Sequence, residues 1–299
     1  MTSTSTQLRQ SLIGTSDGLV TSPPDEHRLL TGAAVTAVHA AGDDVWVLVG
    51  GHDLLRLRGD DVETVATVPD GAGGCIATHA GTVWVGGRRA ALWRLIDGTL
   101  APVESFQSAP THDEWHTPWG GPPDILSMAS DGTHLYVGVH VGGILRTVDG
   151  ESWTATIDLH DDVHQVAVGT DGTVWAATGR RGLAESDDRG ATWRYHVDGL
   201  HARYALAVAP VTGGALVAVS SGHAGRDGAV YRLDGGRLRR CNTLPDELHG
   251  AVGPRQLAAS GAQAVVSLPS GDVHQSHDAG AHWTRIATAL PDVSEVTLR

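Results

Sequence analysis

The sequence contains no lysine: all 21 basic residues are arginine, against 34 acidic residues and a net charge of −13. Without a lysine amine, a Schiff-base mechanism of the lysine type is excluded. The acidic balance disfavours nucleic acid and anionic membranes as partners, because phosphate binding requires a basic surface. The bias toward arginine, alanine and glycine is typical of a GC-rich genome.

Cysteines and long apolar runs are also scarce. Cys75 and Cys241 lie far apart, which excludes a zinc site built on four cysteines or on a close cysteine pair. We expect two buried free thiols, with a single disulfide as the alternative. No run of 18 apolar residues is present, and the N-terminal residues have no apolar signal segment. We therefore expect a cytoplasmic protein without a transmembrane helix.

What is present is a repeated pattern of short apolar strands separated by glycine and Asp-Gly turns. Six segments share an apolar strand, a turn and a second strand that is centred on an aromatic residue in the clearer copies. They begin at Ala34, Gly73, Asp124, Asp162, Tyr204 and Arg255. Repeats of roughly 40 to 50 residues, with about four strands each, indicate the blades of a β-propeller.

We therefore predict an all-β fold: a single seven-bladed β-propeller over residues 1–299, with four antiparallel strands per blade. The N- and C-terminal strands are expected to complete one blade together, which removes exposed sheet edges. The expected blades are residues 1–32 plus 291–299, 33–72, 73–110, 124–160, 162–200, 203–245 and 254–290.

Three turns between expected third and fourth strands carry a related motif. Ser186–Trp193 reads SDDRGATW and matches S-x-D-x-G-x-T-W in full. Ser276–Trp283 has His282 in place of threonine, and Thr147–Trp153 is one residue shorter. The chain thus resembles the Asp-box (BNR) repeat propellers, which include sialidases, sortilin-type domains, xyloglucanases and photosystem II assembly factors. The resemblance covers nearly the whole chain and implies the fold; it implies no particular activity, because enzymes and non-enzymes share the motif.

The connections within a propeller blade alternate between its two faces. The Asp-box turns lie on one face, so we expect the functional site on the other, where the blade-to-blade links gather around the channel mouth. The longest link, residues 105–123, contains two tryptophans and two histidines that no strand position explains. We expect these residues to contact a substrate or, alternatively, to cap a neighbouring blade. They are Trp115, Trp119, His112 and His116.

Three histidines of the same face fall on neighbouring blades: His140, His164 and His201. We expect them to meet at one metal ion, since neutral imidazoles suit Zn, Fe, Cu or Ni and three histidines with an open position are typical of catalytic metals. Without a metal, the same histidines and Tyr204 are candidate acid or base catalysts. The alternative is that His140 and His164 are hydrogen-bonded channel residues. Candidates for completing the ligand shell or orienting a ligand are Asp161, Asp162 and Tyr204.

Arginines on this face suggest an anionic ligand, because guanidinium groups bind oxyanions through paired hydrogen bonds. Arg203 and Arg255 lie where first strands enter the channel mouth, and we expect substrate contacts from both, together with His223 and Arg226. The adjacent pairs Arg88-Arg89 and Arg180-Arg181 are expected to be solvated turn residues.

Three functions remain open, and we favour the first. It is a small-molecule enzyme with a histidine-rich, metal-assisted or acid–base pocket. The second is a non-catalytic module that binds a protein partner. The third is a sialidase-like glycosidase, which requires a Tyr–Glu pair; Tyr204 has no evident glutamate nearby. A nucleotide enzyme is disfavoured, because neither a phosphate-binding loop nor a strand–GxGxxG–helix unit is present.

Overall fold

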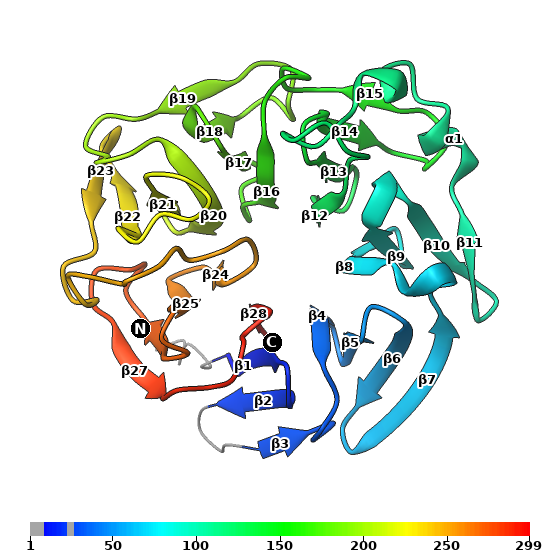
Figure 1. Cartoon of the computed structure of the whole chain (residues 1–299), viewed down its shortest axis with the longest axis horizontal. Coiled ribbons are helices and arrows are strands. Elements are labelled where there is room, and N and C mark those ends of the chain that lie inside the picture. Colours follow the sequence, from blue (N-terminus) through cyan, green and yellow to red (C-terminus); the bar gives the residue numbers. More distant parts are fainter. Residues whose placement is uncertain (1–8, 23–26) are drawn as a thin grey trace, which may run out of the picture.

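The computed structural model describes residues 9–22 and 27–299, which form seven four-stranded antiparallel sheets arranged in a ring (Figure 1). This arrangement confirms the predicted seven-bladed β-propeller. In the described part of the chain, helix is limited to α1 (Glu104–Gln107) and three short 3-10 turns at Pro69–Gly71, Arg88–Ala90 and His112–Glu114.

Six sheets follow the chain order from the innermost to the outermost strand. The first sheet contains β4 (Val35–Ala41), β5 (Asp44–Val49), β6 (Asp53–Arg58) and β7 (Asp61–Thr67). The second contains β8 (Gly73–His79), β9 (Thr82–Gly87), β10 (Leu92–Ile96) and β11 (Thr99–Pro102). The third contains β12 (Ile125–Ser130), β13 (Leu135–Val139), β14 (Gly143–Thr147) and β15 (Thr154–Ala155). The fourth sheet contains β16 (Val163–Val168), β17 (Val174–Thr178), β18 (Gly182–Ser186) and β19 (Arg194–His196). The fifth contains β20 (Tyr204–Val211), β21 (Gly214–Ser220), β22 (Ala229–Asp234) and β23 (Arg237–Arg240). The sixth contains β24 (Leu257–Ser260), β25 (Gln263–Ser267), β26 (Val273–Ser276) and β27 (Thr284–Ala287).

The seventh sheet combines strands from the two ends of the chain. Its innermost strand is β28 (Glu295–Leu298), followed by β1 (Ser11–Thr15), β2 (Gly18–Ser22) and β3 (His27–Leu29). In the β1–β28 pair, Ser11 lies opposite Leu298 and Gly14 opposite Glu295. The ring therefore closes as the sequence predicted, because β28 covers the inner edge of β1.

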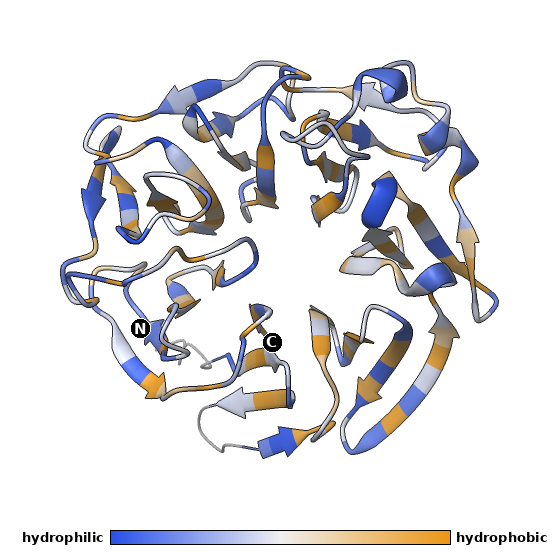
Figure 2. Cartoon of the chain, in the orientation of Figure 1, coloured by the Kyte–Doolittle hydropathy of each residue, from blue (hydrophilic) through white to orange (hydrophobic). Residues whose placement is uncertain are grey.

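The core lies between neighbouring sheets, and polar and apolar residues alternate along many strands (Figure 2). Tyr136 and Ile144 of one sheet pack with Val163 and Val174 of the next, and all four are fully buried. Burial stabilises each such aliphatic side chain by about 1.5–3 kcal/mol. The sheets thus form a rigid frame for the loops at the channel mouth.

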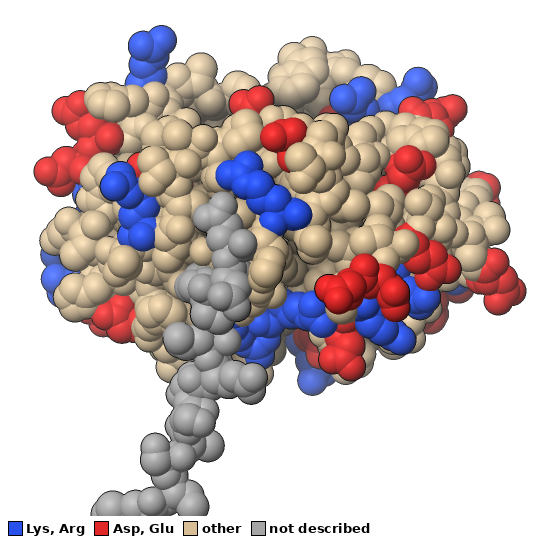
Figure 3. Space-filling model, turned by 90° about the horizontal axis from the view of Figure 1, so that it is seen from below, with Lys and Arg blue, Asp and Glu red and all other residues tan. Residues whose placement is uncertain are grey.

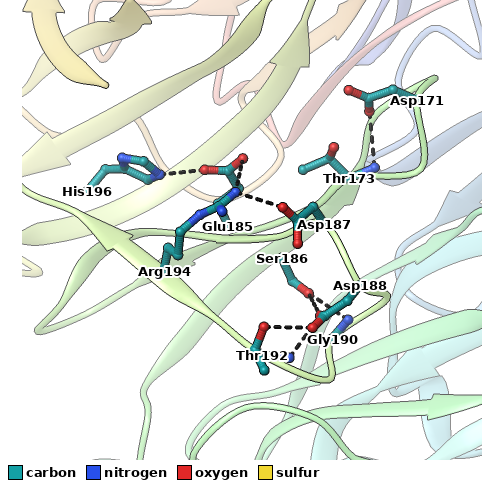
Figure 4. A network of polar contacts seen from close by, with 10 residues as sticks. All are labelled: Asp171, Thr173, Glu185, Ser186, Asp187, Asp188, Gly190, Thr192, Arg194 and His196. Atoms are coloured by element: carbon teal, nitrogen blue, oxygen red, sulfur yellow. Dashed lines mark hydrogen bonds and ion pairs between the residues drawn. The ribbon is translucent and has the colours of Figure 1, made fainter. Parts of the chain in front are cut away.

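Aspartate side chains hold the three motif turns. Asp188 accepts hydrogen bonds from Ser186 Oγ at 2.8 Å, Thr192 Oγ1 at 2.6 Å and the Thr192 amide at 2.8 Å (Figure 4). These bonds lower the pKa of Asp188 to about 2, and the bond from the Thr192 hydroxyl contributes most. Asp278 is bonded in the same way by Ser276 and His282. The turns are satisfied within themselves and have a structural role.

Five of the seven innermost strands begin with a β-bulge at the end where the blade link enters. A bulge inserts one unpaired residue and changes the direction of its side chain. The bulged residues are Thr36, Gly74, Leu126, His164 and Leu206. One of the candidate site histidines therefore stands at a position that the fold sets apart from regular pairing.

Cys75 and Cys241 are both free and buried, so the predicted disulfide alternative is wrong. Burial raises the pKa of Cys75 to about 12 and that of Cys241 to about 11, which leaves both thiols protonated and unreactive. No helix among the described residues is long and apolar enough to cross a membrane. Arginine and acidic side chains are interspersed on the side of the molecule drawn in Figure 3.

Candidate metal centre and adjoining pocket

Two histidines and one aspartate converge at the channel mouth between the sheets of β12 and β16. His140 Nε2 lies 3.0 Å from Asp162 Oδ1, and His164 Nε2 lies 3.4 Å from the same oxygen. One ligand atom from each residue falls within 4.8 Å of the other two. Their side chains are only 12%, 10% and 4% exposed for His140, Asp162 and His164.

Backbone bonds between two blades fix this cluster. His140 follows β13 and forms an isolated antiparallel bridge with Asp162, which directly precedes β16. The Gly179 amide donates to the Asp162 carbonyl at 2.8 Å, and the His140 amide donates to that of Asp124 at 2.9 Å. A methyl group at Gly179 would overlap the Asp162 carboxylate, so the turn after β17 accommodates that side chain only because residue 179 is glycine.

The tautomer of His164 is set by its environment. Its Nδ1 lies 2.6 Å from the carbonyl oxygen of Ala205, which can only accept a hydrogen bond. Nδ1 therefore carries the proton, and in the neutral ring Nε2 turns a lone pair toward Asp162. Asp162 Oδ1 is enclosed and accepts no hydrogen bond of proper geometry. Lone pairs on a nitrogen and a carboxylate oxygen thus face each other, an arrangement that a cation between them would stabilise.

Charge and spacing at the cluster also suit a cation. Burial acts to raise the pKa of Asp162, but the close His140 and His164 rings, which favour the carboxylate when they are protonated, outweigh burial and hold this pKa well below its ordinary range. Asp162 is therefore a carboxylate at neutral pH. Tetrahedral ligands at zinc-type bond lengths are about 3.3 Å apart, close to the observed 3.0 and 3.4 Å. Two histidines and one carboxylate are the donor set of zinc hydrolases and of non-haem iron(II) sites.

A cavity of about 300 Å³ adjoins the cluster. Its walls come from the links and turns of two neighbouring blades: His116, Pro118, Val141, His160, Asp162 and Arg180. Val141 has a φ of 58°, which is unusual for a β-branched residue and marks local strain beside the site. His116 Nδ1 lies 3.0 Å from the Glu114 carbonyl oxygen, so in the neutral ring His116 Nε2 is the free acceptor.

The two tryptophans of the long link have different environments. Trp115 is 6% exposed and packs on Phe106 with ring centroids 5.0 Å apart, so the expectation that it contacts substrate is wrong: it anchors the loop in the core. His112 packs on Trp115 in turn, with ring centroids 4.9 Å apart. Trp119 is 74% exposed, and its ring lies 5.6 Å from that of His140, edge to face. A turn between Thr117 and Gly121 holds Trp119 in that position.

The structure does not bring His201 to the predicted metal centre. His201 Nδ1 lies 2.8 Å from the Tyr231 hydroxyl, and its Nε2 lies 3.4 Å from Asp227. Tyr204 does reach the cluster, with its ring 4.9 Å from that of His164. Burial, and then the Asp162 charge, raise the pKa of Tyr204, so its hydroxyl stays protonated and serves as a donor.

The other predicted substrate contacts lie away from this cavity. The Arg255 guanidinium is engaged by Glu295 at 3.0 Å and by the Thr36 carbonyl at 3.4 Å. Arg203, His223 and Arg226 are exposed but do not line the cavity. Arg180, which was expected to be a solvated turn residue, is exposed in the turn between β17 and β18 and also lines the cavity, a role that the sequence interpretation did not assign to it. Its position between β17 and β18, on the face of the histidines, was the available signal.

No protein-family model matches the sequence, and comparison with curated proteins finds no match. Solved structures do resemble the chain. "YCF48 bound to D1 peptide" is 14% identical with a TM-score of 0.61, and the match covers 90% of each chain. The GH74 xyloglucanase from Xanthomonas campestris is 15% identical with a TM-score of 0.63, over 93% of this chain and 46% of that one. Virginiamycin B lyase from Staphylococcus aureus is 10% identical with a TM-score of 0.63, over 89% and 95%.

At these identities the similarity shows the fold alone. The neighbours include a protein bound to a peptide, a xyloglucanase and a lyase, so the shared propeller does not select a function. Function has to be argued from the residues at the channel mouth.

Proposed function

We propose that the protein is a metal-dependent enzyme acting on a small polar or anionic molecule at the His140–Asp162–His164 cluster. The observation that carries the proposal is the enclosed Asp162 oxygen, which accepts no hydrogen bond while two imidazole nitrogens converge on it. The carboxylate in the donor set favours zinc or iron(II) among the metals that histidines bind.

The surrounding residues supply the other requirements of catalysis. A divalent metal bound here would polarise a substrate oxygen or activate water. His116 Nε2 is positioned in the cavity to take up a proton, because its Nδ1 is committed to the Glu114 carbonyl. Tyr204, whose ring lies 4.9 Å from that of His164, offers a protonated hydroxyl as a hydrogen-bond donor, and the Trp119 ring packs edge to face on His140.

The test is metal analysis of tag-free protein after equilibration with zinc or, anaerobically, with iron(II). We expect about one ion per chain in the wild type and none in the His140→Ala/His164→Ala variant. The matched control is His282→Thr, which removes an exposed histidine on the opposite face and restores the full turn motif. Equal metal content in the wild type and the double variant contradicts the proposal.

A second candidate is a peptide-binding module, favoured by the exposed ring of Trp119 on the functional face. A structural neighbour whose match covers 90% of this chain is described as bound to a peptide. This function requires no metal. A partner recovered equally well by the wild type and the His140→Ala/His164→Ala variant, but lost in Trp119→Ala, would support it over the enzyme.

We also propose that the chain is an Asp-box propeller. The support is the internal hydrogen bonding of Asp188 and Asp278, which follows the motif positions read from the sequence. A glycosidase of the sialidase type is less well supported, because it requires a glutamate beside its tyrosine. The carboxylate whose charge raises the pKa of Tyr204 belongs to Asp162, which already lies 3.0 Å from His140.

A further inference from the structure

Two adjacent arginines in the turn between β17 and β18 have opposite environments. Arg181 lies over the Tyr195 ring, 3.7 Å from its centroid, and its guanidinium is 3.4 Å from Asp161 Oδ2. Tyr195 donates its hydroxyl proton to the same carboxylate at 2.6 Å. The charge of Arg181 is therefore neutralised within the protein, and its side chain fixes the outer part of the turn.

Arg180 has no such neighbour. Among the described residues, no carboxylate lies within 4 Å of its guanidinium, and the side chain lines the cavity beside the metal cluster. Arg180 is exposed, and its place in the cavity wall is what makes its guanidinium available to a ligand bound there. A guanidinium presents several N–H donors in one plane, which matches two oxygens of a carboxylate or phosphate.

We infer that Arg180 binds an oxyanion group, carboxylate or phosphate, of the molecule that this cavity accepts. The inference rests on the proposed metal function, because the Asp162 carboxylate in the cavity wall would repel an anion unless a divalent cation offset its charge. With the cation bound beside Asp162, the metal and Arg180 together present positive charge to one cavity.

The size of the cavity limits the ligand. Its volume of about 300 Å³ equals that of roughly ten water molecules in the liquid. This volume fits a small organic acid or phosphate ester and excludes a polymer segment. The part of the wall formed by His116 and Pro118 follows Trp115, whose packing on Phe106 anchors the loop in the core.

The experiment titrates two anions, inorganic phosphate and malonate, into zinc-loaded protein in a calorimeter, with malonamide as the uncharged counterpart of malonate. We expect at least one anion to bind and malonamide not to bind. Phosphate binding alone identifies a phosphate ligand, and malonate binding alone a carboxylate ligand. Arg180→Gln should weaken the bound anion at least tenfold while zinc stays at one per chain, and Arg180→Lys should restore part of the affinity.

Arg203→Gln is the control, since Arg203 is exposed and lies outside the cavity lining. It should leave both zinc content and anion affinity unchanged. Equal anion affinity in Arg180→Gln and the wild type, or no binding of either anion to protein with a full complement of zinc, overturns this inference and leaves the metal proposal intact. A wild-type protein that takes up neither zinc nor iron(II) overturns the metal proposal itself, and this inference with it.

Discussion

Asp162 depends on a glycine in the neighbouring turn. The Gly179 amide holds the Asp162 carbonyl, and the space that a Cβ would take at residue 179 is filled by the Asp162 carboxylate. The position of a candidate metal ligand is therefore determined by a residue that carries no functional group.

We predict that Gly179→Ala lowers zinc affinity at least tenfold, because the added methyl group displaces the Asp162 carboxylate. The measurement is a competition titration of zinc against a chelator. Gly222→Ala is the matched control, since nothing lies within 4 Å of a Cβ there. Equal zinc affinities for Gly179→Ala and the wild type would show that Asp162 is not a ligand.

The two tryptophans of the long link give a second prediction. Trp115→Ala removes a buried ring from the core and should lower the free energy of unfolding by about 3–5 kcal/mol. Trp119→Ala changes an exposed side chain and should alter it by no more than about 0.5 kcal/mol. Urea denaturation of both variants measures the difference. Similar losses in the two variants would mean that Trp119 also anchors the loop.

At the scale of elements, the β-bulge at the start of the inner strands explains why His164 serves the site. The same position holds Leu126 in the preceding sheet and Leu206 in the following one. The fold thus accommodates an apolar side chain at the bulge. The pairing of β16 does not require a histidine at this position.

We therefore predict that His164→Leu keeps the propeller intact and abolishes zinc binding. The substitution removes the hydrogen bond from His164 to the Ala205 carbonyl. It also removes the His164 Nε2 lone pair that faces Asp162, and with it one of the metal ligands. We expect a melting temperature within a few degrees of the wild type. Circular dichroism and metal analysis of the same sample test this, with His282→Thr as control. Unfolding of His164→Leu would indicate a structural histidine instead.

Much of the fold follows from local patterns, and much of the site does not. Blade-length repeats predict seven sheets, because each repeat needs neighbours on both sides to bury its apolar residues. His140 and His164 are correctly placed together, since the end of β13 lies beside the start of β16 in the next blade. His201 is not, because Tyr231, 30 residues later in the chain, provides a hydrogen-bond partner that spacing alone does not reveal. Arg180 was missed because its sequence neighbour Arg181 looks equivalent, and only the fold separates their environments.

For the whole molecule, Arg255 joins blades across the channel mouth. Its guanidinium contacts Glu295 of the closing sheet and the Thr36 carbonyl, and its amide donates to Gln165 Oε1 at 2.9 Å. Burial raises the pKa of Glu295, an effect that the Arg255 charge opposes. Expected at first to hold substrate, Arg255 instead stabilises the ring.

We predict that Arg255→Met lowers the free energy of unfolding at pH 7 by about 2–3 kcal/mol, since a largely enclosed carboxylate loses its partner. Without Arg255, the folded-state pKa of Glu295 rises further above its unfolded value. The loss of stability therefore grows as pH rises through the folded-state pKa of Glu295. It shrinks below about pH 4.5, where Glu295 is protonated in both the folded and the unfolded state. Urea denaturation at pH 7 and pH 4 measures it.

Two comparisons control this experiment. Arg255→Met/Glu295→Gln should recover most of the stability, because no buried charge remains. Arg58→Met breaks an ion pair with Asp44 in which Arg58 is 62% exposed, and it should cost less than about 1 kcal/mol. A loss in Arg255→Met that is the same at both pH values would mean that packing, not the Glu295 charge, is the cause.

Closure by β28 also sets the order in which the protein can be completed on the ribosome. The strands β1–β3 are synthesised first, yet the strand that lies inside them is residues 295–298. Until those residues leave the exit tunnel, β1 has an open edge and the ring cannot close. The edge of β1 therefore stays open to pairing with other chains until β28 has been synthesised.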